Sequence, residues 1–186
     1  MAAWFKKSPV PDPSESPKTP QLKGSAAPAP KAKGVKISQI LTTDAILIAP
    51  AGLGKDGLLE TLVKRLCELK GLPDPAAFLA KVQEREQGIS TTLDTGLSLP
   101  HARMDAVPTI VAAMGIVPKG IPDPKQPDLT IRLMFLFFSP NKQESFPLHL
   151  QLLRGVSSLF QPAVIDQLTA APTAEAALAL IRKVEA

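Results

Sequence analysis

The sequence predicts an α/β domain in which helices cover both faces of a mixed central sheet, preceded by a disordered tail. The segments Thr109–Val117 and Leu129–Phe138 are apolar on both faces, which is typical of central strands in a covered sheet. Segments with helical periodicity lie before and after these strands, and this mixture favours the α/β class. The first 34 residues are rich in proline and show neither helical nor strand periodicity, which indicates a disordered tail.

Residues 1–34 differ in composition from the rest of the 186-residue chain. They contain seven prolines and six lysines against Asp12 and Glu15, so their net charge of +4 (6 − 2) equals that of the whole chain. Such a segment buries too little apolar surface to offset the entropy lost on ordering. We therefore predict a disordered tail or linker over 1–34 and one domain over 35–186. A solvated tail without specific contacts and a tether to a partner are the two alternatives for its role.

Composition also excludes several classes of function. The chain has no tyrosine and one tryptophan, and its basic excess is confined to the tail, so a stacking platform for nucleic acid is not expected. The longest apolar runs are too short to span a membrane, and the N-terminus lacks the apolar core of a secretory signal. We expect a cytoplasmic protein with no nucleic-acid partner and no direct membrane insertion.

The first half of the domain is predicted to hold one strand and two helices. Ala45–Ala49 is a short apolar run, and Gly57–Leu69 carries an apolar stripe with helical spacing. Asp74 followed by Pro75 is typical of a helix start, and we expect this second helix to end at about Glu86.

Gly52, Gly54 and Gly57 match the GxGxxG spacing of a dinucleotide-binding loop. The helix after this loop is predicted to lead into another helix, so the second parallel strand of a dinucleotide-binding unit is missing. We interpret the glycines as a loop between a strand and a helix.

The second half of the domain begins with a Ser-, Thr- and Gly-rich loop over Gly88–Gly96 and a short strand over Leu97–Leu99. The two apolar strands follow. Three helices are predicted at the C-terminal end, over Pro147–Phe160, Pro162–Leu168 and Thr173–Val184.

Few side chains have a setting that suggests chemistry. Cys67 lies among leucines on a helical stripe, where it is expected to be a small core residue. One cysteine excludes an intramolecular disulfide and a multi-cysteine zinc site. His101 and His149 have no obvious third metal ligand, so neither a metal site nor a cofactor is predicted. No serine lies in a hydrolase motif.

His101 stands out by its local sequence, SLPHAR over Ser98–Arg103. Pro100 fixes its own φ and favours an extended Leu99, so the imidazole leaves a stiff segment with few backbone alternatives. His149 is expected to be a core or boundary residue of its helix when it is considered alone.

Groups that can contact an anion precede His101 in the chain. The loop before it carries the hydroxyls of Ser90 and Thr91, and Arg85 ends the preceding helix. A neutral imidazole with such neighbours suits a nucleophilic histidine that accepts a phosphoryl group.

These segments resemble the signature of the type-2 enzyme IIA domains of the bacterial sugar phosphotransferase system, the fructose/mannitol type and its nitrogen-regulatory relatives. The family pattern runs R-E, three residues, then S-T-G-I-G-N-G-I-A-I-P-H, and a second histidine opens a helix reading H-L-x-x-L. The matching residues here are Arg85-Glu86, Ser90-Thr91, Gly96–His101 and His149–Leu153. Lys55 resembles a lysine at the start of the family's first long helix, and the resemblance covers about residues 36–186.

The resemblance implies a phosphotransferase component that works through phosphohistidine. His101 would carry the phosphoryl group, Arg85 would hold its oxygens, and His149 would lie beside His101. Ser90 and Thr91 would belong to the phosphate-site loop. The implied donor is the small phosphocarrier protein HPr or its nitrogen-branch paralogue, and the acceptor in the sugar branch is a cysteine of a separate IIB domain.

The chain departs from the family pattern in the loop before His101. Thr92 and Asp94 replace two glycines, and Ser98 replaces an alanine. Glycine allows the backbone to approach an anion closely. If Asp94 faces the imidazole, it would repel phosphate and raise the pKa of His101. The alternative is that Asp94 caps a turn and points to solvent.

Two functions from different classes follow from the resemblance. The protein is either a catalytic phosphocarrier in sugar uptake, or a regulatory binding module whose protein partners read the phosphorylation state of His101.

Overall fold

The computed structural model describes residues 35–88 and 90–186. Within these ranges a five-stranded sheet has the order β1-β4-β5-β2, and β3 also pairs with β5. The strands are β1 (Ile46–Ile48), β2 (Leu97–Ser98), β3 (His101–Met104), β4 (Val111–Asp123) and β5 (Gln126–Pro140). β4 and β5 are antiparallel, whereas β1 is parallel to β4, and β2 and β3 are parallel to β5. The mixed sheet is thus confirmed, and the predicted tail over 1–34 lies outside the described residues.

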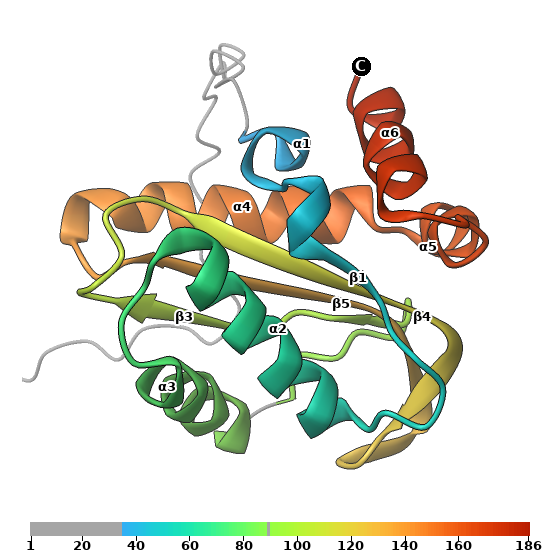
Figure 1. Ribbon diagram of the computed structural model, residues 1–186, viewed down its shortest axis with the longest axis horizontal. Helices are drawn as coiled ribbons and strands as arrows, with labels where there is room; N and C mark the ends of the chain where they lie inside the picture. The colour runs from blue at the N-terminus through green and yellow to red at the C-terminus, as the bar shows by residue number, and fades with distance from the viewer. Residues whose placement is uncertain (1–34, 89) are drawn as a thin grey trace, which may run out of the picture. The chain divides into compact units, whose positions relative to one another are not determined.

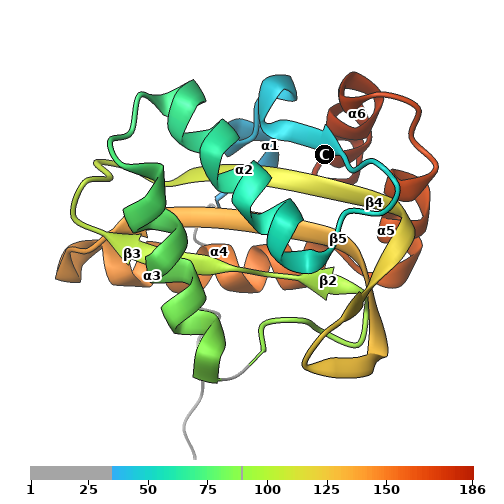
Figure 2. The same ribbon diagram turned by 60° about the horizontal axis from the view of Figure 1, so that its bottom comes forward.

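Helices cover both faces of this sheet, as predicted. In Figures 1 and 2, α2 and α3 lie on one face and α4 lies on the other. The helices are α1 (Ile37–Ile40), α2 (Lys55–Lys70), α3 (Pro75–Gly88), α4 (Phe146–Leu159), α5 (Pro162–Thr169) and α6 (Ala174–Val184), with 3₁₀ turns at Thr43–Ala45 and Gln143–Ser145. No helix in the described ranges is both long and apolar enough to cross a membrane.

β4 and β5 form the centre of the sheet because their side chains are apolar on both faces. Ala113 of β4 lies opposite Leu136 of β5, and both side chains are fully buried. α2 packs directly over β4 at Gly115, where an added Cβ would lie 3.0 Å from Leu58. The absence of a side chain at Gly115 lets the helix approach the sheet closely.

The β4–β5 hairpin extends further than predicted. β4 continues from Val117, where the apolar run ends, to Asp123. A register shift lies between Ile116 and Ile121, and Gly120 there has φ of +70°. Between these two pairs β4 advances by five residues and β5 by two, so the irregularity accommodates three extra residues of β4 while the strands stay paired on both sides of it. Pro118, Lys119 and Pro122 of this continuation are exposed, so it lacks the continuous apolar pattern that identifies a strand in sequence.

The helices on the α2 face end and begin where the sequence predicts. α2 ends at Gly71, which adopts the left-handed conformation with φ of +61°. The Asp74 side chain accepts a hydrogen bond from the Ala77 N–H at 3.1 Å, and α3 starts at Pro75. Because α3 follows α2 directly and β1 pairs with β4, the glycines between β1 and α2 are a strand-to-helix loop, as interpreted from the sequence.

Two short strands with a break between them carry the SLPHAR segment along β5. Leu97 and Ser98 pair with β5, and pairing resumes at His101, which lies opposite Phe137. The ladder is interrupted at Pro100, which has no N–H to donate. Its carbonyl still accepts from the Phe137 N–H at 3.2 Å. The pairing on both sides of Pro100 therefore holds His101 in a fixed position at the start of β3.

Candidate functional site

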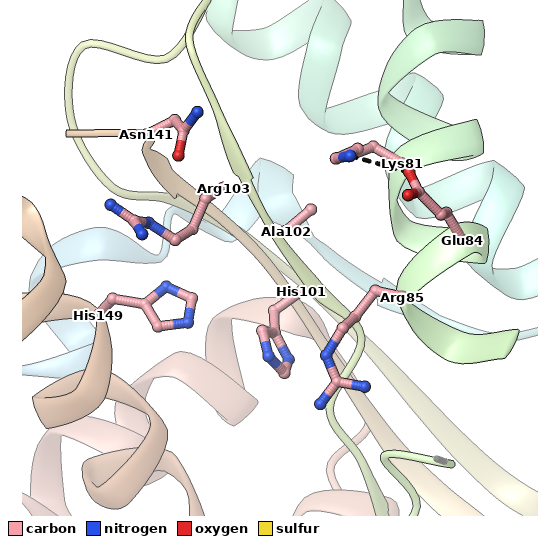
Figure 3. Close-up of a pocket in the computed structure, with 8 residues that line it drawn as sticks. All are labelled: Lys81, Glu84, Arg85, His101, Ala102, Arg103, Asn141 and His149. Atoms are coloured by element: carbon pink, nitrogen blue, oxygen red, sulfur yellow. Dashed lines mark hydrogen bonds and ion pairs between the residues drawn. The ribbon is translucent and has the colours of Figure 1, made fainter. Parts of the chain in front are cut away.

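A cavity of about 420 Å³ lies where β3, the end of β5, α3 and α4 meet (Figure 3). Its lining contains both histidines of the chain and three basic side chains. The lining residues are Lys81, Glu84, Arg85, His101, Ala102, Arg103, Asn141 and His149. The structure thus brings together His101, His149 and Arg85, which are distant in sequence.

The imidazole of His101 is held at one nitrogen. Nδ1 lies 2.8 Å from the carbonyl oxygen of Leu99, and the ring stacks on Phe137 with centroids 5.3 Å apart and planes at 9°. A carbonyl oxygen can only accept a hydrogen bond, so Nδ1 carries the proton. In the neutral ring, Nε2 therefore has the free electron pair, which is the requirement for a nucleophile.

Burial lowers the pKa of His101 below its usual value because it disfavours the charged ring. The hydrogen bond to the Leu99 carbonyl raises this pKa, the charge of Arg85 lowers it, and the charge of Glu86 raises it. The net direction is downward, so His101 is neutral near pH 7.

His149 lies in the first turn of α4 and faces His101, with ring centroids 5.4 Å apart. Its Nδ1 lies 2.7 Å from the hydroxyl oxygen of Ser139, which is fully buried at the end of β5. Burial, followed by the charges of His101 and Arg103, lowers the pKa of His149 to about 4. Both imidazoles of the cavity are therefore neutral at pH 7.

Basic side chains make the cavity suitable for an anion. Lys81, Arg85 and Arg103 oppose one carboxylate, Glu84, so the formal charge of the lining is +2 (3 − 1) with both imidazoles neutral. Lys81 forms an ion pair with Glu84 at 2.8 Å. Figure 3 shows the guanidinium of Arg85 beside His101 and that of Arg103 beside His149.

Arg103 was not predicted as a site residue. Its Nη2 donates to the carbonyl of Lys142 at 2.7 Å, and its guanidinium lies 5.2 Å from the ring centroid of Phe146. Side chains at positions i and i+2 of a strand point to the same face, so Arg103 shares the face of His101 on β3. The spacing of two residues between His101 and Arg103 could have indicated this, but only if the segment had been recognised as a strand.

Ser90 and Thr91 do not line the cavity. The Ser90 hydroxyl donates to Asp123 at 3.2 Å, and the Thr91 hydroxyl donates to Glu86. Both carboxylates belong to a buried charged cluster around Lys55. A phosphate contact from these two hydroxyls stays a prediction.

The buried charged cluster consists of Lys55, Glu86 and Asp123. Lys55 Nζ lies 2.9 Å from Asp123 Oδ2, 3.2 Å from Glu86 Oε2 and 3.4 Å from the Thr92 hydroxyl. Burial raises the pKa of Asp123, but hydrogen bonds from Thr92, Lys55 and the Lys125 N–H, together with the charge of Lys55, lower it to about 2. The cluster ties the start of α2 to the end of α3 and to the β4–β5 hairpin.

The departures from the family pattern lie away from the imidazole. Thr92 is buried beside Lys55, and its hydroxyl lies 3.4 Å from that of Ser98. Asp94 is exposed in a turn closed by the Gly96 N–H and the Leu93 carbonyl at 3.1 Å.

The register of β5 separates this turn from His101. Gly96 contacts β5 near Thr130, whereas His101 lies opposite Phe137. Even the four residues from Leu133, the partner of Leu97, to Phe137 span about 13 Å of strand. Asp94 therefore points to solvent, which is the second alternative from the sequence.

Comparison with known proteins agrees with this geometry. The sequence model of the family described as "Phosphoenolpyruvate-dependent sugar phosphotransferase system, EIIA 2" matches residues 39–184. A nitrogen regulatory protein of Pseudomonas aeruginosa is 25% identical over 152 residues, which cover 81% of this chain and 97% of that protein. A fructose-specific EIIA component of Haloferax volcanii is 29% identical over 133 residues, covering 71% and 85% of the two chains.

Solved structures show the same fold. The nitrogen regulatory protein IIA-Ntr of Neisseria meningitidis superposes with a TM-score of 0.67 at 23% identity, covering 78% of this chain and 98% of that chain. IIA mannitol of Escherichia coli superposes with a TM-score of 0.63 at 19% identity, covering 76% and 98%. Because the family model spans most of the described domain, the chain belongs to the EIIA 2 family of the phosphoenolpyruvate-dependent sugar phosphotransferase system.

Proposed function

We propose that the protein accepts a phosphoryl group on Nε2 of His101 from HPr or its nitrogen-branch paralogue. It then passes the group to a IIB domain or presents it as a regulatory signal. The observation that supports this most directly is the hydrogen bond from Nδ1 of His101 to the Leu99 carbonyl, because it leaves the electron pair of Nε2 free. Members of this family are components of a phosphotransferase system, and a neutral, half-buried histidine beside basic residues fits that chemistry.

The transfer step requires one bond to form and one to break. Nε2 of His101 attacks the phosphorus of the donor's phosphohistidine, and the phosphorus–nitrogen bond of the donor breaks. The electron pair of that bond stays on the donor imidazole, so both proteins keep their histidines and the reaction is reversible. Such a transfer depends on positioning and charge stabilisation rather than on further covalent chemistry.

The basic lining stabilises the phosphorylated state. Phosphorylation adds about 1.5 to 2 negative charges and strong acceptor oxygens to His101. Arg85 can bind two of these oxygens through its planar guanidinium, and Arg103 supplies a second guanidinium. His149 lies close enough to donate one hydrogen bond.

The surroundings of the cavity suit a protein partner. Phe146, Leu148 and Leu150, in the same part of α4 as His149, are exposed large apolar side chains. A partner that covers them would exclude water from the transferring group. In the solved complex of enzyme IIAMtl with phosphorylated enzyme IIBMtl from Escherichia coli, the IIA chain has the fold described here, with a TM-score of 0.65 at 17% identity. We extend that pairing to this chain as part of the proposal.

Phosphorylation in vitro tests the proposed role. The protein is incubated with phosphoenolpyruvate, enzyme I and HPr, and acid-labile phosphate is measured on the parent, His101→Ala and His149→Ala. We expect phosphate on the parent and on His149→Ala and none on His101→Ala. Undiminished labelling of His101→Ala would refute the assignment.

The regulatory alternative is favoured by the nitrogen regulatory relative, which covers more of this chain than the fructose-specific relative does. The two functions differ in the fate of the phosphate. A carrier transfers it to the cysteine of an added IIB domain within the time of turnover. A regulatory module keeps it in the presence of IIB domains and binds a protein partner with an affinity that changes when His101 is phosphorylated.

A further inference from the structure

The buried contact between Ser139 and His149 has a direction that the structure determines. The hydroxyl oxygen and Nδ1 are 2.7 Å apart, and Ser139 has no exposed surface. Either the hydroxyl donates to an unprotonated Nδ1, or a protonated Nδ1 donates to the hydroxyl oxygen. These two arrangements place the single proton of the neutral imidazole on opposite nitrogens.

Counting donors and acceptors selects between the two directions. Among the described residues, the Ser139 hydroxyl makes no hydrogen bond other than the one to His149. If Nδ1 donated to it, the hydroxyl proton would be buried without an acceptor, which is unfavourable. If the hydroxyl donates to Nδ1, both groups are satisfied by the same bond. The second arrangement is therefore the stable one.

The consequence concerns the other nitrogen of His149. With Nδ1 as the acceptor, the ring proton is on Nε2. Figure 3 shows the ring of His149 lining the cavity with one nitrogen on the side of His101. An N–H on that side can donate to a phosphoryl oxygen, whereas an electron pair there would repel it.

We propose that Ser139 is a positioning residue that fixes His149 as the Nε2–H tautomer, so that His149 donates a hydrogen bond to the phosphoryl group on His101. This inference rests on the proposed phosphorylation of His101. The two imidazoles then have opposite protonation at Nε2. The Leu99 carbonyl leaves an electron pair on Nε2 of His101, which attacks phosphorus, and the Ser139 hydroxyl leaves a proton on Nε2 of His149, which binds phosphoryl oxygen.

Nuclear magnetic resonance of the unphosphorylated protein tests the tautomer directly. The chain has two histidines, so long-range proton–nitrogen spectra of tag-free protein labelled with [15N]histidine resolve both rings, and His149→Ala assigns them. At pH 7 we expect the parent to show His149 protonated at Nε2 and unprotonated at Nδ1. A parent protonated at Nδ1 of His149 would overturn the proposal whether or not the protein is phosphorylated.

Variants at Ser139 test whether the hydroxyl is the cause. In Ser139→Ala we expect the Nδ1–H tautomer of His149 to appear and the rate constant for phosphorylation by HPr to fall by about threefold to tenfold. Ser139→Thr keeps a hydroxyl and should restore both. Ser157→Ala removes an α4 hydroxyl that donates to the Leu153 carbonyl, and it should change neither.

The outcomes separate this inference from the proposed function. A parent that accepts no phosphate refutes the proposed function, while the spectra of the unphosphorylated protein still decide the tautomer. If Ser139→Ala folds and keeps both the parent tautomer and the parent rate constant, Ser139 does not position His149. If Ser139→Ala does not fold, the parent spectrum and the Ser139→Thr rate constant decide.

Discussion

At the scale of single residues, the proposed function assigns the nucleophile to His101 and the binding of the phosphoryl group to the side chains beside it. His101 is neutral because partial burial lowers its pKa, and its Nε2 is free because Nδ1 is bonded to the backbone. Arg85 and Arg103 supply positive charge from α3 and β3. The chemistry thus depends on side chains from separate elements that point into one space.

Arg85→Lys tests the geometry of phosphoryl binding. Lysine keeps the positive charge but loses the planar pair of donors that binds two oxygens together. We expect the equilibrium of phosphoryl exchange with HPr to shift toward phosphorylated HPr by about tenfold, which corresponds to the loss of one charged hydrogen bond. Lys64→Arg, which keeps the charge of an exposed lysine on α2, is the matched control and should leave the equilibrium unchanged.

The depressed pKa of His149 predicts a pH dependence of stability. A histidine whose pKa is about 4 in the folded protein and 6.5 when unfolded binds more protons in the unfolded state between these values. The free energy of unfolding should therefore fall as the pH is lowered from about 6.5 to 4, by up to roughly 3 kcal/mol from this residue. The measurement is urea unfolding across that range.

His149→Gln provides the comparison for this prediction, because glutamine does not titrate. Its free energy of unfolding should fall less steeply than that of the parent between pH 6.5 and 4. Parallel curves for the two proteins would show that His149 is not the group responsible.

At the scale of elements, the buried charged cluster holds α2, α3 and the β4–β5 hairpin together near the site. Lys55 pairs with Glu86, which directly follows Arg85 in α3, and with Asp123 at the end of β4. Thr91 contacts Glu86 through its hydroxyl and accepts the Leu99 N–H through its carbonyl. The cluster is thus linked through Thr91 to Leu99, the residue that binds His101 Nδ1.

Lys55→Met should strongly destabilise the fold. The substitution leaves the carboxylates of Glu86 and Asp123 buried without a counter-charge, and breaking a buried pair in this way costs about 3 to 5 kcal/mol. Lys64→Met removes an exposed ion pair with Glu60 on the same helix and should cost less than about 1 kcal/mol. Equal losses in urea unfolding would contradict a structural role of the cluster.

Elements with a strong local pattern were predictable from the sequence. The apolar runs predicted β4 and β5, and the helical stripes predicted α2 and α4. Asp74 with Pro75 predicted the start of α3. β3 was not predicted as a strand because four residues carry no periodicity of their own, and only its pairing with β5 defines it. The extension of β4 was not predicted because Pro118, Lys119 and Pro122 interrupt its apolar pattern.

The same limit applies to the site. His101 and Arg85 follow from the local sequence and the family resemblance, but the contact of Ser139 with His149 and the cluster around Lys55 join residues from different elements. Such contacts depend on the register of β5 and on the packing of helices. Neither of these can be read from local sequence patterns. Arg103 is partly predictable, because its spacing of two residues from His101 places both side chains on one face once β3 is known to be a strand.

At the scale of the whole molecule, the charge of the chain is divided unevenly. Residues 1–34 carry the entire net charge of +4, whereas 35–186 contain fifteen basic and fifteen acidic side chains. The positive charge of the cavity is therefore local to the site and not a general property of the domain. We therefore expect the proposed partner to contact the cavity and the apolar side chains beside it.

Deletion of residues 1–34 tests whether the domain over 35–186 folds and is phosphorylated without this segment. The sequence predicts that the segment adds no apolar core and no site residue, so the deletion should leave the melting temperature and the rate of phosphorylation by HPr unchanged. A substantial loss of either in the shortened chain would show that the segment contributes to the domain.

The position of the phosphate on the full chain tests the proposed role of His101. The protein is phosphorylated with phosphoenolpyruvate, enzyme I and HPr, and phosphorus NMR together with peptide mass spectrometry identifies the modified atom. We expect one phosphohistidine, with phosphorus on Nε2 of His101, because Nδ1 is bonded to the Leu99 carbonyl. Phosphate on Nδ1 of His101, on His149 or on a residue outside the cavity would contradict it.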